Sequence, residues 1–277
     1  MPEVELSVGT IEYEDSGTGP VLVFLHGIHM DGAVWRAVAA DLSAGHRCVV
    51  PTLPMGAHRH PMRPGTDLSM PGQARILTEF LDRLGLDAVT LVGNDTGGVV
   101  AQLLAGENAK PVERLVLTSC EAFDNFPPGL PGRVDAMSAR MPGGLYLSML
   151  SLRLKPLRRA PFTFGRMAKR PIPGDIFTGW LDPVLKNRAV RKDAVVCVRA
   201  VHRDHTRAAA EGLPSYDRPA LVVWASEDRV MPPEHGRRLA DLLPQATYAE
   251  IDDTYTLIPL DQPAKLASQI RDFVMET

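Results

Sequence analysis

The sequence is poor in cysteine, in aromatic residues and in net charge. Its three cysteines, Cys48, Cys120 and Cys197, lie far apart and form no Cys-x-x-Cys pair. This spacing argues against a disulfide framework and a cysteine zinc site, and it favours a reduced, cytoplasmic protein. The formal net charge is only −3 for 277 residues. We therefore expect neither nucleic acid nor a membrane as a partner, because no overall charge attracts them.

Several recognisable segments are also missing. No apolar run approaches the roughly 20 residues that span a bilayer. Residues Met1–Glu5 lack the basic start and apolar core of a signal peptide. No nucleotide-binding motif is present, and His202 and His205 lack the further ligands that a metal site needs. We expect a small-molecule substrate and no metal or cofactor, and the sequence predicts neither the substrate nor the oligomeric state.

Short apolar stretches alternate with segments of helical spacing. Helices are expected at Trp35–Leu42 and after Ser69, whose hydroxyl can cap a helix that has Pro71 in its first turn. Two-sided apolar strands belong in a mostly parallel sheet that helices cover on both faces, so the fold class is α/β. The expected strands are Val4–Val8, Ile11–Tyr13, Val21–Leu25, Cys48–Val50, Ala88–Val92, Leu115–Leu117, Ala220–Trp224 and Tyr248–Ile251.

The alternation stops after Cys120. From Phe123 to Ser215 the sequence has many prolines and several helical patches but no clean strand. We therefore predict a core made of residues 1–122 and 216–277, with residues 123–215 inserted as a mainly helical cap. The cap should lie over the strand ends, where open α/β sheets bind their ligands.

One stretch, Leu91–Val100, carries the strongest functional signal. An apolar strand ends at Gly93, and Gly97 and Gly98 open an apolar helix. Small residues on both sides of Asp95 allow a sharp turn, which presents this one side chain beside a helix N-terminus. Such a turn is typical of a nucleophile, and the residue at its apex is a carboxylate.

The order of strand, His26-Gly27, turn at Asp95, helical insertion and later Asp228 resembles the α/β-hydrolase fold over nearly the whole chain. Among its members, an apical Asp resembles haloalkane dehalogenases and epoxide hydrolases. The resemblance implies that a carboxylate attacks an sp³ carbon to give an alkyl ester, which a histidine-activated water then hydrolyses.

The resemblance assigns roles residue by residue. It implies that Asp95 is the nucleophile and that the backbone N–H groups of Ile28 and Thr96 form the oxyanion hole. Asp228 matches the acid that orients the histidine, and Glu121 matches the alternative acid position. Asp228 and Glu121 are equally compatible with purely structural roles.

The histidine itself is missing. Counting back from Asp261-Gln262-Pro263 places Thr256 at its position, with Tyr255 beside it, and neither is a base near neutral pH. Thr96 and Ile28 also replace the halide-binding side chains of the dehalogenases, which disfavours dehalogenation. Epoxide hydrolases protonate the epoxide oxygen with tyrosines of the cap. Tyr146 and Tyr216 could have this role here, although a cap tyrosine is more often structural.

Three functions remain open. The first is an enzyme resembling epoxide hydrolases and haloalkane dehalogenases that acts on a small to medium apolar molecule. The second is a non-hydrolytic enzyme (a cyclase, an eliminating lyase or an isomerase) in which Asp95 is a general acid and base and buried carboxyls share protons. The third is a catalytically inactive protein that only binds a ligand.

Further residues are expected around the substrate. The expected pocket residues are His29, Trp35, Tyr146, Trp180, Tyr255 and Thr256, and Phe162, Phe164 and Phe177 are further candidates. The start of the insertion is basic. A solvated face explains this more simply than attraction of an anionic substrate or partner. The basic residues are Arg153, Lys155, Arg158, Arg159, Arg166, Lys169 and Arg170.

Overall fold

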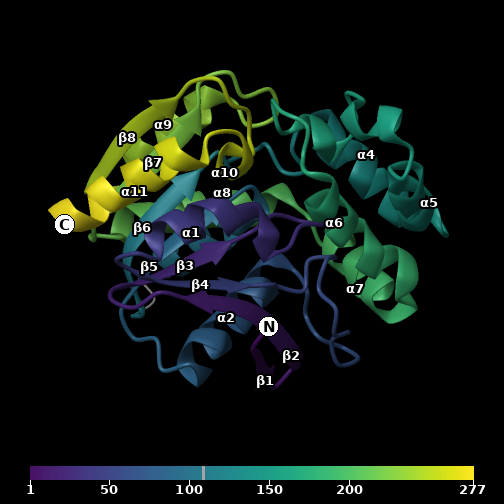
Figure 1. Cartoon of the computed structure of the whole chain (residues 1–277), viewed down its shortest axis with the longest axis horizontal. Helices are drawn as coiled ribbons and strands as arrows, with labels where there is room; N and C mark the ends of the chain where they lie inside the picture. The colour runs from purple at the N-terminus through teal and green to yellow at the C-terminus, as the bar shows by residue number, and fades with distance from the viewer. Residues whose placement is uncertain (108–109) are drawn as a thin grey trace.

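A single eight-stranded sheet organises the chain. The computed structural model describes residues 1–107 and 110–277. The strand order is β1-β2-β4-β3-β5-β6-β7-β8 (Figure 1). Strand β2 runs antiparallel to β1 and β4, and the remaining pairs are parallel, as the sequence predicted. The strands are β1 Glu3–Leu6, β2 Gly9–Ser16, β3 Val21–Leu25, β4 Arg47–Pro51, β5 Val89–Asn94, β6 Val112–Thr118, β7 Ala220–Ala225 and β8 Ala246–Ile251.

The central strands are apolar because both of their faces are covered. Every residue of β5 and β7 is buried, which fits the continuous apolar runs seen in the sequence. Two strands are clearly longer than predicted: β6 begins at Val112 and not at Leu115, and β2 continues to Ser16 beyond the predicted end at Tyr13. Asp15 and Ser16 pair with Val49 and Cys48 of β4, so the turn starts later than expected.

Helices form a layer on each side of the sheet. Helices α1 and α11 pack against one another, and α3 packs against α2 and α8 (Figure 1). Helix α2 begins after Ser69, whose side chain accepts a hydrogen bond from the Gly72 backbone, as predicted. The core helices are α1 Arg36–Leu42, α2 Met70–Arg83, α3 Thr96–Gly106, α8 Arg203–Gly212, α9 Pro233–Leu242, α10 Ile258–Asp261 and α11 Pro263–Glu276.

Four helices between β6 and β7 form a separate body beside the sheet (Figure 1). We call residues 129–201 the cap. It has a small apolar core of its own, built from Leu145, Met149 and Leu152 of α5 against α6 and α7. The cap helices are α4 Gly129–Arg140, α5 Gly144–Ser151, α6 Gly174–Lys186 and α7 Arg188–Arg199.

Helix α8 belongs with the core. The predicted cap ended at Ser215, but α8 lies against α3, where Gly106 and Gly212 approach closely. A Cβ atom added to Gly212 would lie 2.8 Å from the Gly106 Cα. This packing moves the end of the cap to about Val201. Among the described residues, no helix is long and apolar enough to cross a membrane.

We expect Ser69→Ala to lower the free energy of unfolding by about 1 kcal/mol, because the first turn of α2 loses its side-chain acceptor. The measurement is urea denaturation followed by circular dichroism. Ser268→Ala removes a hydroxyl inside α11 that caps no helix, and it should change stability by less than about 0.5 kcal/mol. Equal effects of the two substitutions would contradict the capping role.

Candidate active site

The turn at Asp95 joins the central strand β5 to helix α3. Asp95 has a φ of 54°, which a non-glycine residue adopts only under local constraint. The glycines that follow Asp95 let the start of helix α3 pack closely against its neighbours. A Cβ atom on Gly97 would lie 2.3 Å from the Leu25 carbonyl oxygen, and one on Gly98 would lie 2.3 Å from the Cys120 Cβ. The sequence therefore places one carboxylate, under strain, at the N-terminus of a buried helix.

Backbone and hydroxyl donors hold one oxygen of this carboxylate. Asp95 Oδ1 accepts hydrogen bonds from the Thr96 backbone N–H at 2.7 Å and from the Thr96 hydroxyl at 3.0 Å. Burial raises the pKa of Asp95, and hydrogen bonds from the backbones of Thr96 and Ile28 counteract part of that rise. A Cβ atom on Gly27 would lie 2.2 Å from Oδ1. The two expected oxyanion donors thus converge on Asp95 itself.

A second carboxyl group reaches the same hydroxyl. The Thr96 Oγ1 atom lies 2.9 Å from Glu121 Oε1 and 3.0 Å from Asp95 Oδ1. A hydroxyl group donates only one hydrogen. It can bond to both carboxyls only if one of them is protonated and donates to Oγ1. Burial raises the pKa of Glu121 well above its usual range, and the nearby Asp95 charge raises it further. Glu121 is therefore the protonated partner, and Asp95 accepts from Thr96.

Asp228 pairs with a threonine. Its Oδ1 atom accepts hydrogen bonds from the Thr256 hydroxyl at 2.8 Å and from the backbones of Val230 and Met231 at 2.9 Å each. Its Oδ2 atom is buried and has no partner among the described residues. Burial raises the pKa of Asp228 to about 6. Thr256 therefore fills the position beside Asp228 where the family resemblance expects an imidazole.

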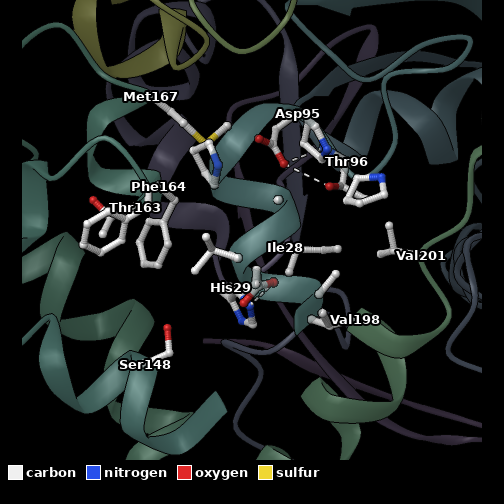
Figure 2. A pocket seen from close by; sticks show the side chains of 18 of the residues that line it. Ile28, His29, Asp95, Thr96, Ser148, Thr163, Phe164, Met167, Val198 and Val201 are labelled. Atoms are coloured by element: carbon white, nitrogen blue, oxygen red, sulfur yellow. Dashed lines mark hydrogen bonds and ion pairs between the residues drawn. The ribbon is translucent and has the colours of Figure 1, made fainter. Parts of the chain in front are cut away.

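No described imidazole forms a hydrogen bond to Asp95. His26 is structural, since its ring nitrogens lie 2.9 Å from the Gly27 carbonyl and 2.9 Å from the Leu53 backbone nitrogen. His29 points to the cap instead, with Nε2 2.9 Å from Asp135 Oδ2 of α4 (Figure 2). Its Nδ1 atom is buried without a partner in the described part of the chain.

Asp95 and its neighbours lie on the wall of a cavity between core and cap (Figure 2). The cavity has a volume of about 280 Å³ and is mainly apolar. Its core side is formed by Ile28, His29, Asp95, Thr96 and Glu121. Phe126 lines it just before the cap, and the cap side includes Val134, Ser148, Met149, Leu152, Phe162, Thr163, Phe164, Met167, Val198 and Val201.

Among the six expected pocket residues, His29 alone lines this cavity. Trp35 packs on Phe24 in the core, and Trp180 donates to Asp31 behind the wall. Tyr255 lies under the Arg229 guanidinium, 4.4 Å from its ring centroid, and Thr256 bonds to Asp228.

The tyrosines expected to protonate an epoxide are also elsewhere. Tyr146 lies under Arg191 in a separate surface groove, and Tyr216 is fully buried away from the cavity. Phe162 and Phe164 do line the cavity, whereas Phe177 stacks behind Phe164. Val198 and Val201 also line the cavity, although nothing in the sequence distinguishes them from ordinary helix residues.

One group of possible metal ligands occurs among the described residues, away from the cavity. Glu3, Glu12 and His60 bring their ligand atoms within 4.8 Å of one another beside the β1–β2 hairpin. Arg59 forms an ion pair with Glu12 there. This group has no connection to the residues around Asp95.

Comparison with known proteins identifies the family. The family model described as "Alpha/beta hydrolase family" matches residues 22–269. The chain therefore belongs to the α/β-hydrolase family. Its fold is the α/β-hydrolase fold, and part of its sequence is similar to haloalkane dehalogenases.

Individual relatives agree with this assignment. Haloalkane dehalogenase 2 from Mycobacterium tuberculosis is 36% identical over 112 residues, which cover 40% of this chain and 38% of the dehalogenase. A cis-3-alkyl-4-alkyloxetan-2-one decarboxylase from Xanthomonas campestris is 27% identical over 95% of this chain and 92% of its own. The haloalkane dehalogenase DbeA from Bradyrhizobium elkani superposes with a TM-score of 0.79 at 18% identity, covering 99% of this chain and 98% of its own.

The raised pKa of Asp228 predicts a specific pH dependence of stability. The folded protein holds a proton at Asp228 up to about pH 6, whereas the unfolded chain releases it near its ordinary value of 3.8. Below about pH 4 this proton stabilises the folded state by at most about 3 kcal/mol. The stabilisation is lost as the pH rises through 6. We expect Asp228→Asn to flatten the dependence of unfolding free energy on pH in this window.

The control is Asp241→Asn, which removes an exposed carboxylate on α9. Its pH dependence, measured by urea denaturation at each pH, should follow that of the parent. An unchanged slope in Asp228→Asn would show that folding does not raise the pKa of Asp228.

Proposed function

We propose that the enzyme catalyses a non-hydrolytic proton-transfer reaction, an isomerisation or an elimination, on a small to medium apolar molecule held between core and cap. Asp95 is the general base and acid. One observation carries the proposal: Thr256 occupies the place of the base and bonds to Asp228, so the site has a reactive carboxylate without an imidazole to activate water.

The surroundings of Asp95 suit proton transfer. A general base works best when its pKa lies near the working pH, and burial raises the pKa of Asp95 in that direction. In the first step Asp95 takes a proton from a substrate carbon, and the C–H electron pair moves into the substrate. In the second step Asp95 returns the proton to another carbon, or the substrate expels a leaving group.

Glu121 and Thr96 support this cycle. When Asp95 is ionised, its Oδ1 accepts the Thr96 hydroxyl hydrogen, and Thr96 Oγ1 accepts the Glu121 proton. When Asp95 takes the substrate's proton on its other oxygen, Oδ2, this chain of hydrogen bonds stays as it is, because Oδ1 and Oγ1 still accept. A neutral Glu121 also suits its buried Oε2, which has no partner among the described residues, because burying an unpaired ionised oxygen costs far more.

The expected rate effects define a direct test. With a β,γ-unsaturated cyclohexenone as probe, we expect conversion to the conjugated enone, followed by its ultraviolet absorbance. Asp95→Asn should lower the rate at least about 100-fold, because the base is lost. Thr96→Val should lower it about 10-fold, because the link to Glu121 is broken.

The matched control is Thr118→Val, which removes a buried hydroxyl that bonds to the Gly93 carbonyl outside the cavity. This variant should lower the rate, measured in the same way, by less than threefold, which corresponds to about 0.6 kcal/mol. Full activity in Asp95→Asn would reject the role of Asp95 as the base.

Nucleophilic attack by Asp95 is the second candidate. Two observations favour it: the relative from Mycobacterium tuberculosis is named a haloalkane dehalogenase, and Oδ1 of Asp95 is already held by donors that would stabilise an ester intermediate. Attack of Asp95 on a carbon bearing a halide forms an ester bond and expels the halide ion. Attack on an epoxide carbon forms an ester bond and breaks the ring C–O bond, and the resulting alkoxide stays in the ester and takes up a proton. Without a base, that ester should persist.

Intact-mass measurement separates the two candidates. After incubation, nucleophilic attack predicts a wild-type protein heavier by one butyl group with bromobutane, or by one whole styrene oxide molecule with styrene oxide. The Asp95→Asn variant should stay unmodified. Thr256→His places an imidazole beside Asp228 and should release the ester, with loss of the added mass. An unmodified wild-type mass with both reagents would leave proton transfer as the supported function.

A further inference from the structure

Positive and negative residues are unevenly distributed along the chain, and the small net charge conceals this. Residues 129–201 contain fourteen lysines and arginines, four aspartates and no glutamate, although the whole chain has a net charge of −3. The cap is therefore a basic body on an acidic core. The expectation of no membrane partner rested on the net charge alone, so it does not apply to the cap surface.

Exposed apolar side chains gather on the same body. Most of the large apolar residues that are exposed among the described residues belong to the cap. They are Leu130, Met137, Met141, Leu147, Leu150, Leu154, Phe162 and Val196. Single exposed leucines need no explanation, but a concentration of them in one basic domain indicates a binding surface.

Helix α5 shows how these residues are arranged. Leu145, Met149 and Leu152 are buried in the cap, at the spacing of one helix face. Leu147 and Leu150, which are 62% and 42% exposed, lie on the opposite face, and Leu154 continues this line just beyond the helix with 62% exposure. We call Leu147, Leu150 and Leu154 the outer stripe. A helix that is apolar on both faces has one face without a protein partner, and Figure 1 shows α5 at the outer side of the cap.

Cations surround the outer stripe. Lys155 and Arg159 follow it directly and are exposed, and no described carboxylate lies within ion-pair distance of either. At the other end, a groove of about 250 Å³ runs between the start of α5 and α7. It is lined by Tyr146, Leu145, Met141 and four cations, Arg188, Arg191, Lys192 and Arg199, and by no acidic residue.

We propose that the outer face of the cap binds the surface of an anionic lipid bilayer. The outer stripe lies among the lipid headgroups and upper acyl chains, and the neighbouring lysines and arginines bind lipid phosphates. The basic groove has the size and charge for one phosphate headgroup. Two copies of the chain would not pair through this face, because each copy brings the same excess of positive charge.

This surface adjoins the substrate cavity. Phe162 is 44% exposed and also lines the cavity, so it marks a point where the cavity meets the cap surface. Helix α5 has the outer stripe on one side and contributes Ser148, Met149 and Leu152 to the cavity wall on the other. A docked cap would therefore let an apolar substrate enter from the bilayer without crossing water.

The test is flotation of the purified protein with lipid vesicles. Vesicles of phosphatidylcholine with phosphatidylglycerol should bind the protein at least about tenfold more strongly than phosphatidylcholine alone, and added salt should weaken this binding. The combined variant Leu147→Ser, Leu150→Ser and Leu154→Ser should bind at least about tenfold more weakly, because the inserted apolar surface is lost. Lys155→Glu with Arg159→Glu should show a loss of similar size.

The control variant carries Lys265→Glu and Met275→Ser, which change an exposed cation and an exposed apolar residue outside the cap. It should bind like the parent, and circular dichroism melting should confirm that every variant is folded. Asp95→Asn should also bind like the parent, which keeps this result independent of the proposed chemistry.

Three results would overturn the proposal. The first is equal binding to neutral and anionic vesicles, or none to either. The second is loss of binding on charge reversal while the serine variant binds fully, since the surface would then recognise negative charge alone, as an acidic protein offers. The third is a dimer in light scattering that the serine variant converts to a monomer, since the stripe would then join two copies.

Discussion

The site depends on one constraint, the burial of a carboxylate without a cation beside it. Asp95 is 4% exposed, and no described lysine or arginine forms an ion pair with it. Its charge is stabilised mainly by dipoles, which here are the N-terminus of α3, two backbone N–H groups and one hydroxyl, with a smaller contribution from His29. Gly27 leaves the space for these donors to approach, and the strained turn keeps the oxygen in their reach.

The same constraint sets the protonation of the neighbouring acids. Burial raises the pKa of Asp95, Glu121 and Asp228. Negative charges on all three would repel one another in a medium of low dielectric constant. The single Thr96 hydrogen requires that either Asp95 or Glu121 is protonated, and the backbone and hydroxyl donors on Asp95 favour the proton on Glu121. The arrangement thus separates the roles of chemically similar side chains by their surroundings.

The sequence predicted those parts of the site that local chain geometry determines. Asp95, Thr96 and Glu121 follow neighbouring parallel strands, whose carboxyl ends meet at one edge, so their proximity was predictable. Their hydrogen-bond pattern was not, because it depends on rotamers. Trp35, Trp180 and Tyr255 were expected in the pocket, but whether a side chain faces the cavity or packs behind its wall depends on tertiary packing, which no periodicity encodes. Likewise α8 has the composition of a cap helix, and only its contact with α3 places it in the core.

The division into core and cap also separates two kinds of surface. The acidic core contributes the reactive carboxyls of the cavity, Asp95 and Glu121, and the basic cap contributes most of its apolar wall. The His29–Asp135 pair and the Trp180–Asp31 hydrogen bond join the two bodies close to the cavity. Because such polar links are directional, they fix the position of the cap more closely than apolar contacts alone would. A cavity formed in this way keeps its reactive carboxyls away from bulk water, while the opposite side of the same cap helix remains free for other contacts.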